Sequence, residues 1–316
     1  MNKRVYGIIG IASIMSNWNA DFTGYPKTTS TGEIFGSDKA LKYPIKKMWE
    51  QEGKKILYIK SMKLSEDKKG AINLVPRSLK ERYEFIFDEP DLKKSKDIKK
   101  ILTNLFLAED VKNFGATFAE EGNNISITGA VQIGQGFNYY SDSYAEEQQI
   151  LSPFRDASKK NKDNEDAKNS TLGSKIVSNE AHYFYPFTVN PATYNEFIRL
   201  GVTDGYTEEN YNNFKRATLN STTAYNTNSK IGCQNEFVLF IETNSNTYLP
   251  NLTEYLSFEK NENNNRIIIK KGINELINSF GDKIMKVEIY YNPYNTKIDT
   301  NIKKVNYYNI FNGEKV

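Results

Sequence analysis

The chain has 316 residues, of which 38% are hydrophobic, enough to form the core of one large domain or of two ordinary ones. Its 42 basic and 39 acidic residues leave a formal net charge of +3, so any site for a polyanion has to be a local patch. A single cysteine, Cys233, and a single histidine, His182, exclude an internal disulfide framework and a Cys- or His-rich metal site, and leave an Asp/Glu magnesium site open.

The N-terminal run of residues 5–15 is rich in isoleucine and valine and follows two basic residues, Lys3 and Arg4. A secretory signal shares these features, but no clean cleavage site follows and the run is too short to span a bilayer. We therefore interpret it as a buried first strand. We expect a cytoplasmic protein without a membrane partner.

A polar loop over residues 16–27 leads into a predicted helix over residues 37–49. The loop is dense in residues that form turns and hydrogen bonds rather than a core. Ser37 is a favourable N-cap, and Asp38 suits the positive end of the helix dipole. Pro44 lacks the amide that a continuing helix needs, so we expect it to kink or end the helix.

The predicted helix carries an apolar stripe and a neighbouring basic stripe at about 100° per residue. The apolar stripe contains Leu41, Ile45 and Met48, and the basic stripe contains Lys39, Lys42 and Lys46. Amides at a helix start, followed by lysines one turn apart, suit the successive phosphates of a nucleic-acid strand. The alternative is an ordinary solvated charged face.

The rest of the chain alternates between apolar runs and polar connections. The predicted strands cover residues 55–60, 110–118, 125–134, 234–242, 255–258, 266–270 and 284–291, and the predicted helices cover residues 91–107, 191–200, 207–219 and 272–280. Residues 155–180 are a polar excursion between apolar ends, which indicates either a long protruding hairpin or an irregular surface loop.

This order of elements indicates an α+β fold and is compatible with a ferredoxin-like sheet backed by helices. RNA-recognition-motif domains share that topology. Their aromatic signature is absent from this sequence, so we do not expect bases to stack on the sheet.

Three segments, taken together and in order, resemble the backbone subunits of CRISPR Cascade complexes, the Cas seven family, and most nearly its type I-B members. They are residues 17–47, the pair formed by residues 110–116 and 128–132, and residues 221–241. The resemblance covers nearly the whole chain. It implies a non-catalytic protein without a cofactor or a metal ion, whose copies stack along CRISPR RNA (crRNA) and support recognition of target DNA beside other Cascade subunits.

The same resemblance implies a fold shaped like a hand. Its palm would be RNA-recognition-motif-like and would comprise residues 1–52, 110–136 and 186–316. A helical fingers insertion would occupy residues 53–109, and a long thumb hairpin that displaces a nucleotide of the guide would occupy residues 137–185. The residues that the resemblance assigns to RNA binding are Lys39, Lys42, Lys46, Gln132, Asn19, Lys27 and Lys175.

Two other functions stay open at this point. Related backbone subunits of type III complexes cleave RNA with a loop aspartate before the basic helix, and Asp21 lies near the equivalent place. A metal-dependent endoribonuclease is therefore one alternative, although a loop aspartate is more often a turn residue. The other alternative is an oligomeric structural protein without nucleic acid, in which reversing the charge of Lys42 would leave assembly unchanged.

Overall fold

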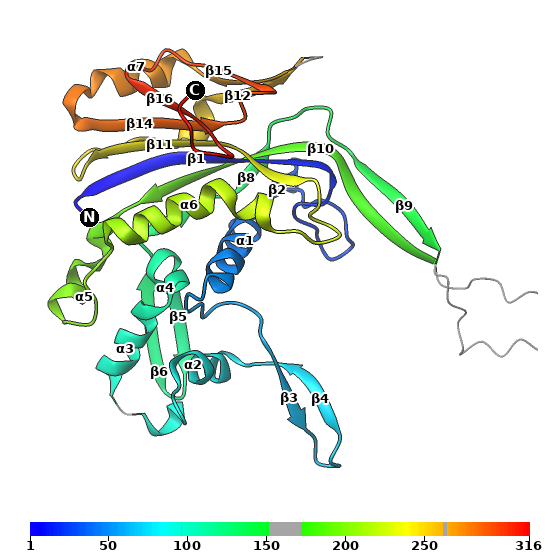
Figure 1. The fold of residues 1–316 in the computed structure, drawn as a ribbon, viewed down its shortest axis with the longest axis vertical. Coiled ribbons are helices and arrows are strands. Elements are labelled where there is room, and N and C mark those ends of the chain that lie inside the picture. The colour runs from blue at the N-terminus through cyan, green and yellow to red at the C-terminus, as the bar shows by residue number, and fades with distance from the viewer. Residues whose placement is uncertain (96, 152–171, 262–263) are drawn as a thin grey trace, which may run out of the picture.

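A nine-stranded sheet forms the centre of the molecule (Figure 1). The computed structural model describes residues 1–95, 97–151, 172–261 and 264–316, so residues 152–171 of the predicted hairpin lie outside the described part. The strand order is β16 (Val305–Asn309), β14 (Ile284–Tyr291), β11 (Cys233–Asn244), β1 (Lys3–Ser16), β10 (Leu172–Val189), β8 (Gly136–Asn138), β2 (Phe35–Gly36). Strands β7 (Val131–Ile133) and β9 (Ala145–Leu151) also pair with β10.

Strand β1 is the predicted first strand, and it pairs antiparallel with β10 on one side and β11 on the other. Its side chains alternate between two cores: Ile9 and Ile11 belong to one hydrophobic cluster, and Tyr6 and Ile8 belong to the other. Gly7 allows the close packing, because a Cβ atom there would lie 2.1 Å from the carbonyl oxygen of Leu239. The central strand thus connects both layers.

Two helices cover one face of the sheet, α1 (Asp38–Gln51) and α6 (Glu208–Ala224) (Figure 1). Leu41, Ile45 and Trp49 of α1 are fully buried in the larger cluster. The expectation that Pro44 could end the helix is wrong, since α1 continues to Gln51. Pro44 is itself buried, so its ring adds to the packed face.

The other face carries a small sheet and the helix α7 (Lys271–Ser279) (Figure 1). The small sheet has the order β12 (Leu256–Lys260), β13 (Asn265–Ile269), β15 (Thr296–Asp299). Together they cover the second hydrophobic cluster. With sheets and helices layered in this way, the α+β class is confirmed.

A lobe inserted after α1 lies beyond the helical face (Figure 1). It contains a hairpin of β3 (Met62–Glu66) and β4 (Ile72–Pro76), then α2 (Leu79–Phe87), α3 (Ile98–Leu107), α4 (Glu109–Phe114) and a second hairpin of β5 (Gly115–Glu120) and β6 (Asn123–Thr128). Two strand predictions are wrong here: residues 55–60 form no strand, and residues 110–114 are helical. Strands β5 and β6 form a sheet of their own, so of the predicted palm strands in residues 110–136 only β7 and the start of β8 lie in the main sheet.

Short elements complete the chain, and β9 with β10 forms a hairpin that projects from one end of the sheet (Figure 1). These elements are η1 (Leu92–Lys94), η2 (Pro191–Tyr194), α5 (Asn195–Arg199), η3 (Leu252–Tyr255) and η4 (Gly281–Lys283). None of the helices in the described residues is both long enough and apolar enough to cross a membrane.

A buried charge cluster joins the small sheet to the main sheet. The ring of His182 is fully buried, with Nδ1 2.8 Å from Glu236 Oε2 and Nε2 3.0 Å from Glu180 Oε1. The ring stacks on Phe258 of β12 at 4.0 Å between centroids, and Lys260 of the same strand pairs with Glu180. Burial alone would lower the pKa of His182, but the two carboxylates raise it to about 9.

We predict a pH-dependent stability from this cluster. Because the folded pKa of His182 lies above its usual value of 6.5, its stabilising contribution is complete below pH 6.5 and is lost as the pH rises towards 9. The free energy of unfolding should fall by up to about 3 kcal/mol across that window. Since the chain has one histidine, a single imidazole NMR resonance reports the pKa directly. A midpoint at or below pH 6.5 in the folded protein would refute the charge pairing.

Candidate nucleic-acid interface

The N-terminus of α1 is held by two side chains of the chain segment before it. The Ser37 hydroxyl accepts a hydrogen bond from the amide of Ala40 at 3.3 Å, as predicted for an N-cap. The side-chain oxygen of Asn19 accepts from the amide of Ser37 at 2.8 Å. The side-chain oxygen of Asn19 therefore helps to position the helix start. Its side-chain amide nitrogen lies 3.4 Å from the carbonyl oxygen of Ala20.

The three predicted lysines of α1 have different environments. Lys39 is exposed. Lys42 forms an ion pair with Asp38 at 2.9 Å, and its ammonium lies 5.1 Å from the centroid of the Phe114 ring. Lys46 donates to the carbonyl oxygen of Tyr58 at 3.0 Å, and burial lowers its pKa. Of the predicted stripe, one ammonium faces solvent freely and two are engaged by the protein.

The partner that draws Lys46 inward is the fully buried carboxylate of Asp110. Its oxygens accept hydrogen bonds from the amides of Leu57 at 2.8 Å and Tyr58 at 2.7 Å, and Lys46 Nζ lies 4.0 Å away. Burial raises the pKa of Asp110, and Lys46 and the two amides oppose that effect. Asp110 thus connects α4, the segment after α1, and α1 itself.

The polar loop after β1 packs against the base of the β9–β10 hairpin. The side-chain amide of Asn17 donates to the carbonyl oxygens of Gly24 at 2.8 Å and Ile176 at 3.1 Å. The hydroxyl of Tyr25 donates to Glu147 of β9 at 3.0 Å. Lys175 precedes Ile176 on β10, so its backbone lies at this junction.

Lys27 belongs to the same loop. Its amide donates to the carbonyl oxygen of Asn19 at 2.9 Å, and its carbonyl oxygen accepts from the amide of Phe35 at 2.9 Å. The structure therefore brings Lys27 and Asn19 together at the helix start, with Lys175 at the nearby hairpin base.

Gln132 lies in another region of the sheet. It pairs with Thr188 near the C-terminal end of β10, whereas Lys175 lies near the N-terminal end of this 18-residue strand. A fully extended strand of that length spans about 60 Å. The exposed side chain of Gln132 donates to the carbonyl oxygen of Gly129 at 2.8 Å. It borders an apolar cavity of about 360 Å³ with Tyr6 and Leu252.

Asp21 forms a turn within the loop. Its Oδ1 accepts from the amide and the hydroxyl of Thr23, at 2.8 and 2.7 Å, and from the amide of Tyr25 at 3.1 Å. The Thr23 hydroxyl is the main cause of the lowered pKa of Asp21. Within the described ranges, no three His, Cys, Asp or Glu side chains are arranged to hold a metal ion.

Sequence reasoning did not identify Lys230, which ties the loop after α6 to the polar loop. Its ammonium donates to the carbonyl oxygens of Asn17 and Trp18, and burial lowers its pKa. The indole of Trp18 donates to the hydroxyl of Tyr185 at 2.5 Å, and both side chains are buried. The one signal in the sequence was Trp18, a large apolar residue in an otherwise polar loop.

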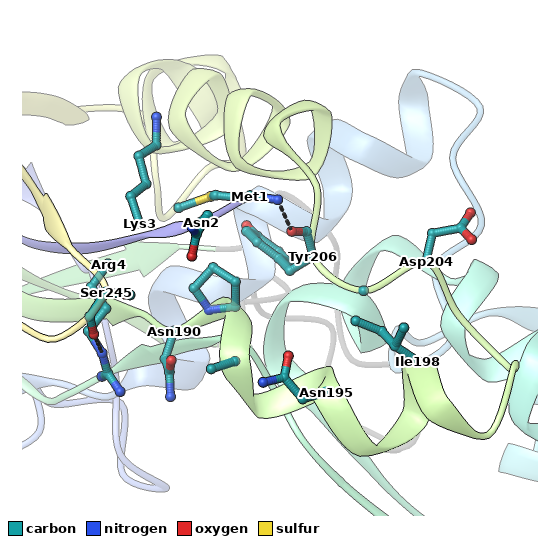
Figure 2. Close-up of a pocket in the computed structure, with 13 residues that line it drawn as sticks. Met1, Asn2, Lys3, Arg4, Asn190, Asn195, Ile198, Asp204, Tyr206 and Ser245 are labelled. Atoms are coloured by element: carbon teal, nitrogen blue, oxygen red, sulfur yellow. Dashed lines mark hydrogen bonds between the residues drawn. The ribbon is translucent and has the colours of Figure 1, made fainter.

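A separate small cavity lies beside the N-terminus (Figure 2). It has a volume of about 150 Å³, and its lining residues include Asn190, Asn195 and Asp204. The amino group of Met1 donates to the carbonyl oxygen of Tyr206 at 3.1 Å (Figure 2). None of the predicted site residues lines this cavity.

Comparison with solved structures defines the class of fold. One chain, described as "CRISPR RNA-guided surveillance complex, pre-nicking", matches with a TM-score of 0.51 and 14% identity over 96% of each chain. Another, described as "CRISPR RNA-guided surveillance complex", matches with a TM-score of 0.50 and 13% identity over 94% of each chain. At this identity the likeness concerns the fold. A sequence comparison with curated proteins finds no significant match.

The family model described as "CRISPR-associated protein Cas7" matches residues 3–287. The protein therefore belongs to the Cas7 family. The match begins at the central strand β1 and ends within β14, so it includes α1, the polar loop, the inserted lobe and the β9–β10 hairpin.

We predict effects of very different size for substitutions at two lysines of α1. Lys46→Met leaves the buried carboxylate of Asp110 without its cation, and it should lower the free energy of unfolding by about 3 kcal/mol. Lys39→Met removes an exposed charge and should change it by less than about 0.5 kcal/mol. Urea denaturation of both variants tests this. Equal effects of the two substitutions would contradict the buried pairing.

Proposed function

We propose that this chain is a non-catalytic, crRNA-binding backbone subunit of a type I Cascade complex, most nearly of the I-B subtype. Copies of it would polymerise along the guide RNA beside other Cascade subunits, and the assembly would support recognition of target DNA. The observation that carries the proposal is the match of the Cas7 family model to residues 3–287. The fold shared with chains of CRISPR RNA-guided surveillance complexes supports it.

The arrangement around α1 supports binding through phosphates. Lys39, in the first turn of α1, offers an exposed ammonium to an anion near the positive end of the helix dipole. The nearby loop adds Lys27, and the hairpin base adds Lys175. Contacts of this kind position a strand without reading its sequence, which leaves the base edges free to pair with a target.

We also propose a palm, fingers and thumb division of the fold. Strands β11, β1, β10 and β8 lie side by side, all antiparallel, with α1 and α6 on one face, and this supports a ferredoxin-like palm. The fingers would be residues 53–128 instead of 53–109, because β5 and β6 pack with the inserted helices: the rings of Tyr83 and Phe118 lie 5.2 Å apart. The thumb would be the β9–β10 hairpin.

The direct test is purification from cells that carry the operon, followed by nuclease digestion and sequencing of the protected polymer. We expect regular footprints of repeat-spacer RNA. In vitro, Lys39→Gln should weaken RNA binding. It should also reduce the magnitude of the slope of log K against log salt concentration by roughly 0.7, the value of one phosphate contact on a single strand.

Lys271→Gln is the matched control, because Lys271 is an exposed lysine on α7, across the sheet from α1 (Figure 1). It should leave both affinity and salt slope unchanged. A protein that purifies free of nucleic acid from those cells would contradict the proposal, and would favour an oligomeric structural protein.

The non-catalytic part of the proposal has its own test at Asp21. Since Oδ1 of the carboxylate accepts hydrogen bonds from the amides and hydroxyl of its own turn, we expect assembled complexes to leave a complementary RNA intact in the presence of Mg²⁺. Asp21→Ala should behave as the wild type does. Cleavage by the wild type that is lost in Asp21→Ala would identify the endoribonuclease instead.

A further inference from the structure

One edge of α1 faces solvent and carries a basic, aromatic and basic residue at successive turns: Lys39, Tyr43 and Lys47. Residues four apart lie above one another on a helix. Lys39 is exposed, Tyr43 is 37% exposed, and Lys47 is half-buried with its ammonium 2.8 Å from Glu50. This edge shares Lys39 with the predicted stripe, whose other lysines, Lys42 and Lys46, are engaged by the protein.

A second aromatic residue joins Tyr43 from another element. The ring of Tyr225, at the end of α6, lies 5.6 Å from the ring of Tyr43 between centroids, at an interplanar angle of 71°. The amide of Tyr225 donates to the carbonyl oxygen of Thr222 at 3.1 Å. The loop that follows is anchored by Lys230 to the segment after β1. Tyr43 is therefore held within α1, and Tyr225 is held between the end of α6 and the loop that Lys230 anchors.

Core packing does not account for these two rings. Neither Tyr43 nor Tyr225 belongs to either hydrophobic cluster or to the partly buried side chains packed against them. Residues 226–229, next along the chain, are exposed and polar. The pair is a small aromatic surface on a basic helix edge, surrounded by hydrogen-bonding groups.

We propose that Tyr43 and Tyr225 form a stacking platform for an unpaired nucleobase of single-stranded RNA, with phosphates of the same strand at Lys39 and Lys47. Tyr43 lies midway between Lys39 and Lys47, whose Cα atoms are about 12 Å apart along the helix axis. Every base offers a π-face, so such a platform tolerates any sequence. This inference rests on the proposed function and adds a base contact to its phosphate contacts.

The test compares two oligonucleotides of equal length and charge at low salt: oligouridine RNA and an abasic RNA backbone. With the full-length chain, Tyr43→Leu keeps an apolar side chain beside Tyr225 but removes the ring. It should weaken binding of oligouridine about fivefold or more, as for one stacked base, and leave binding of the abasic strand unchanged. Tyr43→Phe should retain the wild-type affinity for both.

Two controls separate stacking from other effects. Lys39→Gln should weaken binding of both strands, because it removes a phosphate contact. Tyr294→Leu removes an aromatic residue that is 80% exposed outside α1 and α6, and should change neither affinity.

An equal loss for both strands in Tyr43→Leu, or no loss for either, would overturn the platform and leave the phosphate-binding proposal standing. Failure of the wild type to bind either strand would overturn both.

Discussion

The buried carboxylate of Asp110 constrains how three parts of the chain meet. A charge removed from water is tolerated only when hydrogen bonds and an opposite charge surround it. Here the amides come from Leu57 and Tyr58, and the cation comes from Lys46. These groups belong to α4, to the irregular segment after α1 and to α1, so the inserted lobe and the helix cannot shift independently without leaving the charge uncompensated.

This constraint also decides which edge of α1 reaches solvent. With Lys46 directed at Asp110 and Lys42 paired with Asp38, the helix presents Lys39 and Tyr43 outwards, beside the half-buried Lys47. The start of the helix is fixed separately, through Asn19 and the polar loop. Because the loop is in turn bonded to the β9–β10 hairpin and to Lys230, the helix edge, the loop and the hairpin base form one connected surface.

The sequence predicted the long elements well because their patterns are strong: β14 has the predicted bounds, and β1 and β11 lie within a few residues of theirs. The prediction from sequence failed where a side chain, instead of a neighbouring strand, accepts the hydrogen bonds of the backbone amides. Residues 55–60 looked like a strand, but two of their amides bond to Asp110 rather than to a neighbouring strand. The orientation of α1 about its own axis was also predicted incorrectly. Its buried stripe includes Trp49 and Pro44 and leaves Met48 partly exposed, so Lys42 and Lys46 turn inwards.

The engagement of two lysines inside the protein limits what one copy can do with a polyanion. Each phosphate contact adds a modest, salt-dependent term, and a chain with a net charge of +3 has little excess positive charge for such contacts. Under the proposed function, tight binding therefore has to come from repetition, since linking many weak sites on one polymer raises the overall affinity without new contacts. A base stacked on Tyr43 and Tyr225 would add affinity that salt does not screen, so the assembly would depend less on ionic strength than its phosphate contacts alone imply.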